Sequence, residues 1–345
     1  MAITILHVDG FEHNTVSGDR YSSAERGGTP STSSPGVYGY GRALFMNVAG
    51  HWISPLLSGA PYTTIFTSFH YKPDSNVFNN EPLMQFFDDS VSTVQVTISA
   101  QFSAVSGKFN LSVYRGTTSG TLLTTATGAI PPAGFWCHVS VMCTVNTTNG
   151  RVKVNIDGVT VIDFTGNTQN TANTRIDRVR FPVTTSNGYN YDNWIIASGL
   201  PTDPMLPEIR VYTQFPTGND AAQFTVSGAA ANWSAVNEAP PNGDTSYNYS
   251  STVGHQDTFT FSAPSIGATV HALQVCYDAR RDDAGPRAMR AVVKPTTTAY
   301  DSGADDTLAS TYFIYKKIWM TNPETSAAWT PGQATAAKFG YKLTV

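Results

Sequence analysis

Apolar and polar residues alternate with a period of two along much of the first half of the chain. In residues 92–102, the side chains of Val94, Val96 and Ile98 fall on one face, followed by Phe102. The same alternation returns in residues 109–114 and 135–145. Because successive side chains of a β-strand point to opposite faces, these segments are predicted to be half-buried antiparallel strands.

A β-hairpin is the clearest local prediction. Two alternating runs, Val152–Ile156 and Val159–Asp163, are separated by Asp157-Gly158. A two-residue type I′ turn requires positive φ at both central positions, and Asp-Gly satisfies this requirement. Residues 189–197 are predicted to be the closing strand of this region, and residues 1–8 its first strand. The N-terminus has no cationic start and no long apolar run, so we interpret it as a strand and not a secretory signal.

A proline-rich segment divides the chain. Residues 199–207 contain Pro201, Pro204 and Pro207, and proline cannot donate to a strand ladder. We therefore predict a jelly-roll domain over residues 1–198, a linker over 199–207 and a smaller β-sandwich domain over 208–345. The predicted fold class is all-β.

The second domain is predicted to contain strands and one short helix. Strands are expected near 209–214, 257–262, 269–278, 287–294 and 311–319, and the third and fourth are expected to form a hairpin around 280–286. Thr330, Pro331 and Gln333 have the order of a capping box, with the threonine as N-cap and proline at the first helical position. Gly340 is expected to end this helix, before a terminal strand over 341–345.

Composition narrows the classes of partner. Charged residues make up 13% of the chain and the net charge is −4, against a usual charged share of about 25%. Without a basic excess, direct binding to nucleic acid is not expected. No run approaches the roughly 20 apolar residues that span a bilayer, so no membrane partner is expected.

The cysteines are predicted to be buried thiols. Cys137 and Cys143 lie on the same face of one predicted strand, about 20 Å apart at the rise of an extended chain. A disulfide requires Cα atoms within about 7 Å. Cys276 has no evident mate, and the three together indicate synthesis in a reducing compartment.

No catalytic or metal centre is evident in the sequence. The six glutamates show no spacing that would pair two carboxylates about 5–5.5 Å apart on a strand, as retaining glycosidases require, and no Gly-x-Ser-x-Gly motif occurs. His138 shares a strand face with Trp136 and Met142 and is interpreted as a packed or surface histidine. The expectation is a protein that is not an enzyme and has no cofactor.

Two acidic segments are considered as possible metal-binding sites. His7 and His13 flank Asp9 and Glu12, although aspartate and glycine beside a first strand are more typical of a turn. Residues 301–306 carry oxygen ligands but lack the spacing of an EF-hand, and are interpreted as a solvated loop. The predicted metal content is none.

Four tyrosines are candidates for binding a glycan. Tyr38 and Tyr40 share a face if their segment is extended, and so do Tyr189 and Tyr191. Aromatic rings beside polar side chains suit a sugar, and packing within the core is the alternative interpretation.

The first half resembles the concanavalin-type, laminin-G-like jelly rolls carried by phage genomes. The resemblance rests on the opening residues 9–13, on Phe135-Trp136, on the hairpin over 152–162 and on residues 191–194. In the second half, residues 275–287 and 318–330 resemble a C-terminal domain of phage minor structural proteins. That family supplies no catalytic residues.

This resemblance implies a bacteriophage virion protein, such as a head decoration, tail or baseplate accessory protein. Its expected partners are other virion proteins and copies of itself, and its expected location is the virion after synthesis in the host cytoplasm. The alternative is a glycan-binding module of a phage appendage that contacts polysaccharide on the host surface. A glycoside hydrolase is a third hypothesis.

Overall fold

A computed structural model describes residues 3–12, 21, 25–39, 41–57, 59–76, 79–262 and 269–345. The chain divides into two compact units, the first extending to Val211 and the second containing Tyr212–Val345. The first unit therefore includes residues 199–207, which were predicted to be a linker. Among the described residues, the regular secondary structure of both units is almost all strand, with one short α-helix, so the all-β prediction is confirmed.

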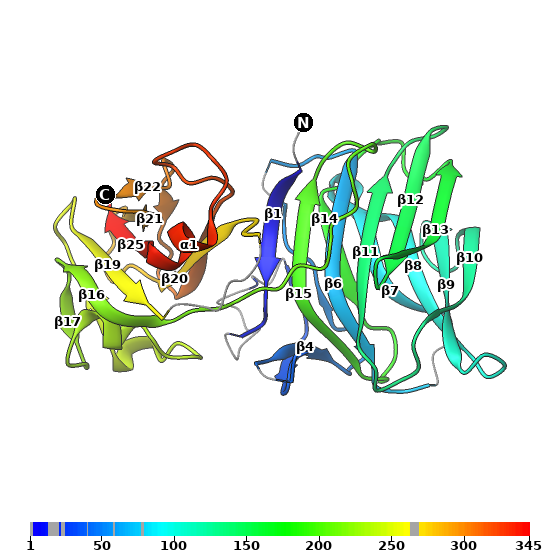
Figure 1. Ribbon diagram of the computed structural model, residues 1–345, viewed down its shortest axis with the longest axis horizontal. Helices are drawn as coiled ribbons and strands as arrows, with labels where there is room; N and C mark the ends of the chain where they lie inside the picture. Colours follow the sequence, from blue (N-terminus) through cyan, green and yellow to red (C-terminus); the bar gives the residue numbers. More distant parts are fainter. Residues whose placement is uncertain are drawn as a thin grey trace. The chain divides into compact units, whose positions relative to one another are not determined.

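The larger sheet of the first unit has eight strands among the described residues, in the order β13-β12-β11-β6-β15-β4-β3 with β1 paired to β15. Figure 1 shows β13, β12, β11, β6 and β15 side by side. The strands of this sheet are β1 (Thr4–Asp9), β3 (Ser31–Ser33), β4 (Ala43–Met46), β6 (Thr64–Pro73), β11 (Cys137–Thr144), β12 (Gly150–Ile156), β13 (Val159–Gly166) and β15 (Tyr189–Ser198).

The smaller sheet packs behind it and has seven strands in the described part of the chain, in the order β10-β9-β8-β7-β14-β5-β2. A short 3-10 turn, η1 (Asp89–Val91), follows β7. The strands of this sheet are β2 (Arg26–Gly27), β5 (Trp52–Ile53), β7 (Glu81–Asp88), β8 (Thr93–Ser103), β9 (Lys108–Arg115), β10 (Thr121–Ile130) and β14 (Arg178–Pro182).

The predicted alternation places the core between these sheets. Val96 and Ile98 of β8 point inward, as do Val139 and Val141 of β11, and all four are fully buried. The hairpin of β12 and β13 turns at Asp157 and Gly158, whose φ angles are 49° and 80°, so the type I′ prediction is confirmed.

The second unit is a smaller sandwich with its own core, which includes Phe259, Trp319 and Tyr341. One sheet has the order β16-β19-β25-β21-β22 with β23 on β21, and two strand pairs, β17-β18 and β20-β24, accompany it. Its elements are β16 (Pro216–Ala222), β17 (Thr225–Ser227), η2 (Asn232–Ala235), η3 (Gly243–Thr245), β18 (Tyr247–Tyr249), β19 (Gln256–Phe261), β20 (Leu273–Ala279), β21 (Ala288–Lys294), β22 (Tyr300–Asp301), β23 (Asp306–Thr307), β24 (Phe313–Trp319), α1 (Pro331–Ala336) and β25 (Lys338–Leu343).

Two strand predictions for this part of the chain are wrong. β20 pairs with β24 and β21 pairs with β25, so the hairpin predicted around residues 280–286 does not form. Period-two alternation specifies which face of a strand is buried but not which strand lies beside it. Residues 209–214 form no strand, and within this segment the Val211 N–H donates to the Asn193 side-chain oxygen Oδ1 and not to the backbone of a neighbouring strand.

The helix begins as predicted but ends early. Thr330 Oγ1 accepts from the Gln333 N–H at 3.2 Å, which confirms the capping box. Ala337 leaves the helix in extended conformation, and Gly340 lies inside β25 instead of ending the helix. A Cβ at Gly340 would approach the Asp257 carbonyl oxygen to 1.9 Å, so glycine allows β19 and β25 to pair there. Cys137 and Cys143 are buried free thiols, whereas Cys276 is partly exposed, contrary to the prediction.

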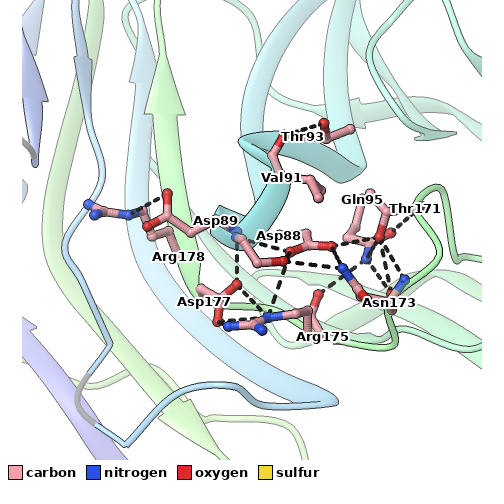
Figure 2. A network of polar contacts seen from close by, with 11 residues as sticks. Asp88, Asp89, Val91, Thr93, Gln95, Thr171, Asn173, Arg175, Asp177 and Arg178 are labelled. Carbon is pink, nitrogen blue, oxygen red and sulfur yellow. Dashed lines mark hydrogen bonds and ion pairs between the residues drawn. The ribbon is translucent and has the colours of Figure 1, made fainter.

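A polar network joins the end of β7 to residues 171–178 (Figure 2). Asp88 is fully buried, and its Oδ2 accepts from Thr171 Oγ1 at 2.7 Å and Asn173 Nδ2 at 2.9 Å. Arg175 pairs with Asp177 at 2.6 Å. Burial opposes ionisation of Asp88, but hydrogen bonds from Ser90, Thr171 and Asn173 outweigh the effect of burial and lower the pKa of Asp88. The ionised carboxylate therefore fastens this loop to the sheet.

Replacing Asp88 should destabilise the protein. Asp88→Ala removes the acceptor of the partly buried donors Thr171 Oγ1 and Asn173 Nδ2, and we expect the free energy of unfolding to fall by about 2–3 kcal/mol. Urea denaturation at neutral pH measures this. The control is Asp163→Ala, which removes a more exposed carboxylate paired with Arg151 and should cost less than about 1 kcal/mol. Equal losses for the two variants would contradict the structural role of Asp88.

Candidate functional site

A cluster of ionisable side chains lies on the outer face of the larger sheet. Phe69 and Tyr71 of β6 point into the core, so His70 between them points outward. Cross-strand pairing places His70 beside His138 of β11 on one side and beside Asp192 of β15 on the other. The next row, one strand repeat away, contains Ser68 and Ser140 with Asn155 of β12.

Residues 205–211 cover this face and bring Glu208 to it. Glu208 Oε1 accepts from the Tyr38 hydroxyl and from His70 Nε2, both at 3.0 Å. Because a carboxylate only accepts, the proton of His70 is assigned to Nε2, which leaves Nδ1 to accept from Asn193 Nδ2 at 3.5 Å. The Arg210 guanidinium lies over the Tyr38 ring, 4.2 Å from its centroid.

Burial favours the neutral form of both histidines. Burial lowers the pKa of His70, although Glu208 acts in the opposite direction. Burial, followed by the charge of His70, lowers the pKa of His138 to about 4. His138 Nε2 lies 2.8 Å from Ser68 Oγ, which completes a chain of polar contacts along the face. Two neutral imidazoles can donate and accept hydrogen bonds and can take up protons.

Asp192 is a buried carboxyl at the same face. Its Oδ2 accepts from the Val37 N–H at 2.9 Å and its Oδ1 from the Asn193 N–H at 2.7 Å. Burial raises its pKa to about 7 despite these bonds, and the nearby carboxylates Glu12 and Asp9 act in the same direction. Asn193 has a φ of 50°, where the pairing of β15 with β6 is irregular, and this irregularity sets adjacent side chains at the site.

A pocket of about 300 Å³ opens beside this cluster. On the sheet side its wall is polar and includes Ser140, Asn155 and Asp157, whereas Met205, Leu206 and Pro207 form an apolar wall. His138, Gly158 and Glu208 complete the lining. The Ser140 hydroxyl is buried and has no hydrogen-bond partner in the described structure. An orphaned buried hydroxyl on a pocket wall is a feature that a polar ligand would satisfy.

A second hollow lies between β10 and the β12-β13 hairpin. It is larger, about 610 Å³, and is lined mostly by threonine, alanine, glycine, valine and isoleucine. Neither of the two neutral histidines lines it. Functional sites tend to combine a pocket with groups of perturbed pKa, so the smaller pocket is the better candidate.

The outcome differs among the four tyrosines that were predicted to bind a glycan. Tyr38 lies at the cluster. Tyr40 is outside the described residues. Tyr189 and Tyr191 do share a face, as predicted, but that face is the core: they are 1% and 0% exposed, so their rings cannot contact a sugar, and this assignment is wrong.

Other members of the cluster were not singled out from the sequence. His138 was interpreted as a packed or surface histidine, and Glu208 was assigned to the second domain. Alternation did indicate that His138 points away from Val139 and Val141, but no spacing pattern links residue 208 to residue 70.

The acidic segments considered for metal binding are held by hydrogen bonds and ion pairs. Asp9 Oδ2 accepts from the Tyr21 hydroxyl at 2.6 Å and Oδ1 from the Phe11 N–H at 2.7 Å; His13 is outside the described residues. In the 301–306 loop, Arg290 pairs with Asp301 and Asp305. Within the described ranges, no group of three potential ligands could hold a metal ion. No described helix is long and apolar enough to cross a membrane.

Comparison with known proteins yields similarity of fold alone. No family profile and no curated protein matches the chain. The alginate lyase Aly36B aligns over 56% of this chain and 96% of its own, with 15% identity and a TM-score of 0.40. Domain 4 of AbnA, an arabinanase from Geobacillus stearothermophilus, aligns over 58% and 94%, with 18% identity and a TM-score of 0.40. A galectin-like protein of unknown function from Bacillus subtilis aligns over 57% and 98%, with 10% identity and a TM-score of 0.38.

These comparisons correct one expectation from the sequence. The similar structures include lyases that act on polysaccharides, among them a glucuronan lyase from Trichoderma reesei, as well as the arabinanase domain. The prediction that the chain is not an enzyme is therefore withdrawn. The first unit has a jelly-roll-like β-sandwich fold made of the two sheets described above.

The raised pKa of Asp192 predicts a stability change with pH. The folded state holds this proton up to about pH 7, whereas the unfolded chain releases it near pH 4. Relative to Asp192→Asn, wild type should therefore lose about 1.4 kcal/mol of stability per pH unit between pH 5 and 7, and the loss should level off above that range. Denaturation of both proteins across this range measures the difference.

Asp163→Asn is the control for this titration. Its bond from Arg151 lowers the pKa of Asp163, so its stabilising contribution is lost only in acid and should stay constant from pH 5 to 8. A constant difference between wild type and Asp192→Asn over the same range would show that Asp192 is already ionised at pH 5.

Proposed function

We propose that this protein binds a polysaccharide through the outer face of its larger sheet, with a sugar unit seated in the pocket beside Ser140. The observation that carries the proposal is the buried Ser140 hydroxyl without a partner on the wall of this pocket. Leaving such a group unsatisfied costs about 1–3 kcal/mol, and a ligand hydroxyl would supply the missing bond.

The two walls of the pocket suit the two kinds of surface on a sugar ring. The Asn155 side chain has both donors and an acceptor, while Asp157 and Glu208 have acceptors. The polar wall can therefore bond to sugar hydroxyl groups that donate a hydrogen bond and to those that accept one. Opposite them, Met205 and Leu206 present apolar atoms that can pack on the C–H face of a ring. A phosphate or nucleotide fits less well, because the lining has two carboxylates and neither lysine nor arginine.

We further propose that this binding serves a bacteriophage particle, in which the protein is an accessory component that contacts the host surface. Support comes from the resemblance of residues 275–287 and 318–330 to phage structural proteins. Mass spectrometry of purified particles tests this part separately: the protein should co-purify with the virions, and its absence from them would contradict the virion assignment without affecting sugar binding.

Affinity electrophoresis through gels that contain neutral or uronate-bearing polysaccharides tests the binding site. We expect at least one polysaccharide to retard the wild-type protein. Ser140→Ala should weaken that binding about 3- to 10-fold, the value of one hydrogen bond, and Asn155→Ala should have a similar effect.

Ser112→Ala is the matched control, because it makes the same chemical change, the loss of one serine hydroxyl, in β9 of the other sheet. It should leave the retardation unchanged. If Ser140→Ala and Ser112→Ala migrate like wild type in every gel that retards it, the pocket is not the binding site. Measurement of reducing ends in the same mixtures shows whether binding is followed by cleavage.

A further inference from the structure

Arg180 lies on the outer face of the smaller sheet, between two aromatic rings. β14 pairs with β5 on one side and β7 on the other, and this places the Arg180 guanidinium 4.4 Å from the ring centroid of Trp52 and 3.8 Å from that of Phe87. Trp52 in turn packs on Gly27, where a Cβ would lie 2.1 Å from the indole nitrogen. The aromatic frame that orients Arg180 is therefore itself fixed by packing.

The carboxylates near Arg180 are bound to other arginines. Arg178, two residues earlier on the same face, pairs with Asp89 at 3.1 Å, and Arg175 pairs with Asp177 at 2.6 Å. Figure 2 shows both pairs at the end of β7. Arg180 is half-buried, and its Nε is buried without a hydrogen-bond partner in the described part of the chain.

The surroundings of Arg180 disfavour its positive charge. Burial, and then the charge of Arg178, lower the pKa of Arg180 to about 10. Cation–π contacts offset part of this cost but supply no acceptor for the guanidinium N–H groups. The charge of Asp89 acts in the opposite direction but is paired with Arg178. An anion that reached the guanidinium of Arg180 would therefore stabilise a partly desolvated cation that has no acceptor of its own.

We propose that Arg180 is the centre of an oxyanion-binding site that takes a carboxylate or sulfate group. The planar guanidinium, held by Trp52 and Phe87, can donate two parallel hydrogen bonds to such a group, a geometry that lysine cannot provide. The anion would satisfy the N–H groups that have no protein acceptor. This site is on the opposite sheet from the Ser140 pocket and does not depend on sugar binding there.

Titration of the full chain with sodium sulfate, sodium acetate or sodium glucuronate tests the site, with chloride used to keep the ionic strength constant. We expect a saturable change in tryptophan fluorescence and a rise in melting temperature for wild type. Arg180→Gln should weaken the affinity at least 10-fold, and Arg180→Lys should fall between the two, because it keeps the charge but not the fork. Comparison of glucuronate with acetate distinguishes an anion carried on a sugar from a free carboxylate.

Arg151→Gln is the control, because it removes an arginine that is already paired, with Asp163 at 2.7 Å. This variant should bind the anions as wild type does. The proposal is overturned if neither fluorescence nor melting temperature of wild type responds to the anions, or if Arg180→Gln binds them as tightly as Arg151→Gln does.

Discussion

Phe181 joins the two sheets of the first unit. It projects from β14 of the smaller sheet and stacks on Tyr191 of β15 with ring centroids 4.1 Å apart, and it also contacts Trp194 at 4.2 Å and Phe69 at 4.9 Å. All four rings are fully buried. Such pairs add about 0.5–1.5 kcal/mol each beyond the burial of their area. A shift of β14 or β15 by one residue would expose these rings, so the stack fixes the register of both strands.

The outer faces follow from this register. Because side chains alternate, burying Phe181 forces Arg180 outward on one sheet, and burying Tyr191 forces Asp192 outward on the other. The two candidate sites therefore share a cause, although they lie on opposite sheets. At Asn193 the strand departs from this regular alternation, because its backbone enters the left-handed region. The Asn193 side chain contacts both His70 and the N–H of Val211. That contact holds the covering segment against the face.

The sequence predicted what depends on neighbouring residues. Asp157-Gly158 specified its turn, and Thr330 with Gln333 specified a helix start, because both are local bonding patterns. The sequence-based prediction failed where contacts join segments that are far apart in the chain. Glu208 meets His70 through a covering segment that has no periodic pattern, and β20 presents the same alternation whichever strand pairs with it. Alternation correctly placed Tyr189 and Tyr191 on one face, but a face of aromatic residues suits the core as well as it suits a sugar.

The buried ionisable groups are costly for a sandwich that only has to fold. His70, His138 and Asp192 each lie in a place that disfavours their charged form, and Ser140 forfeits a hydrogen bond. Apolar side chains at these positions would avoid the cost, as they do on the inner face of the same strands. These departures from local consistency gather in one place, beside a pocket, and this clustering supports the proposed ligand site. Asp88 is the counterexample within the same unit, because its bonds are complete and it needs no ligand to explain it.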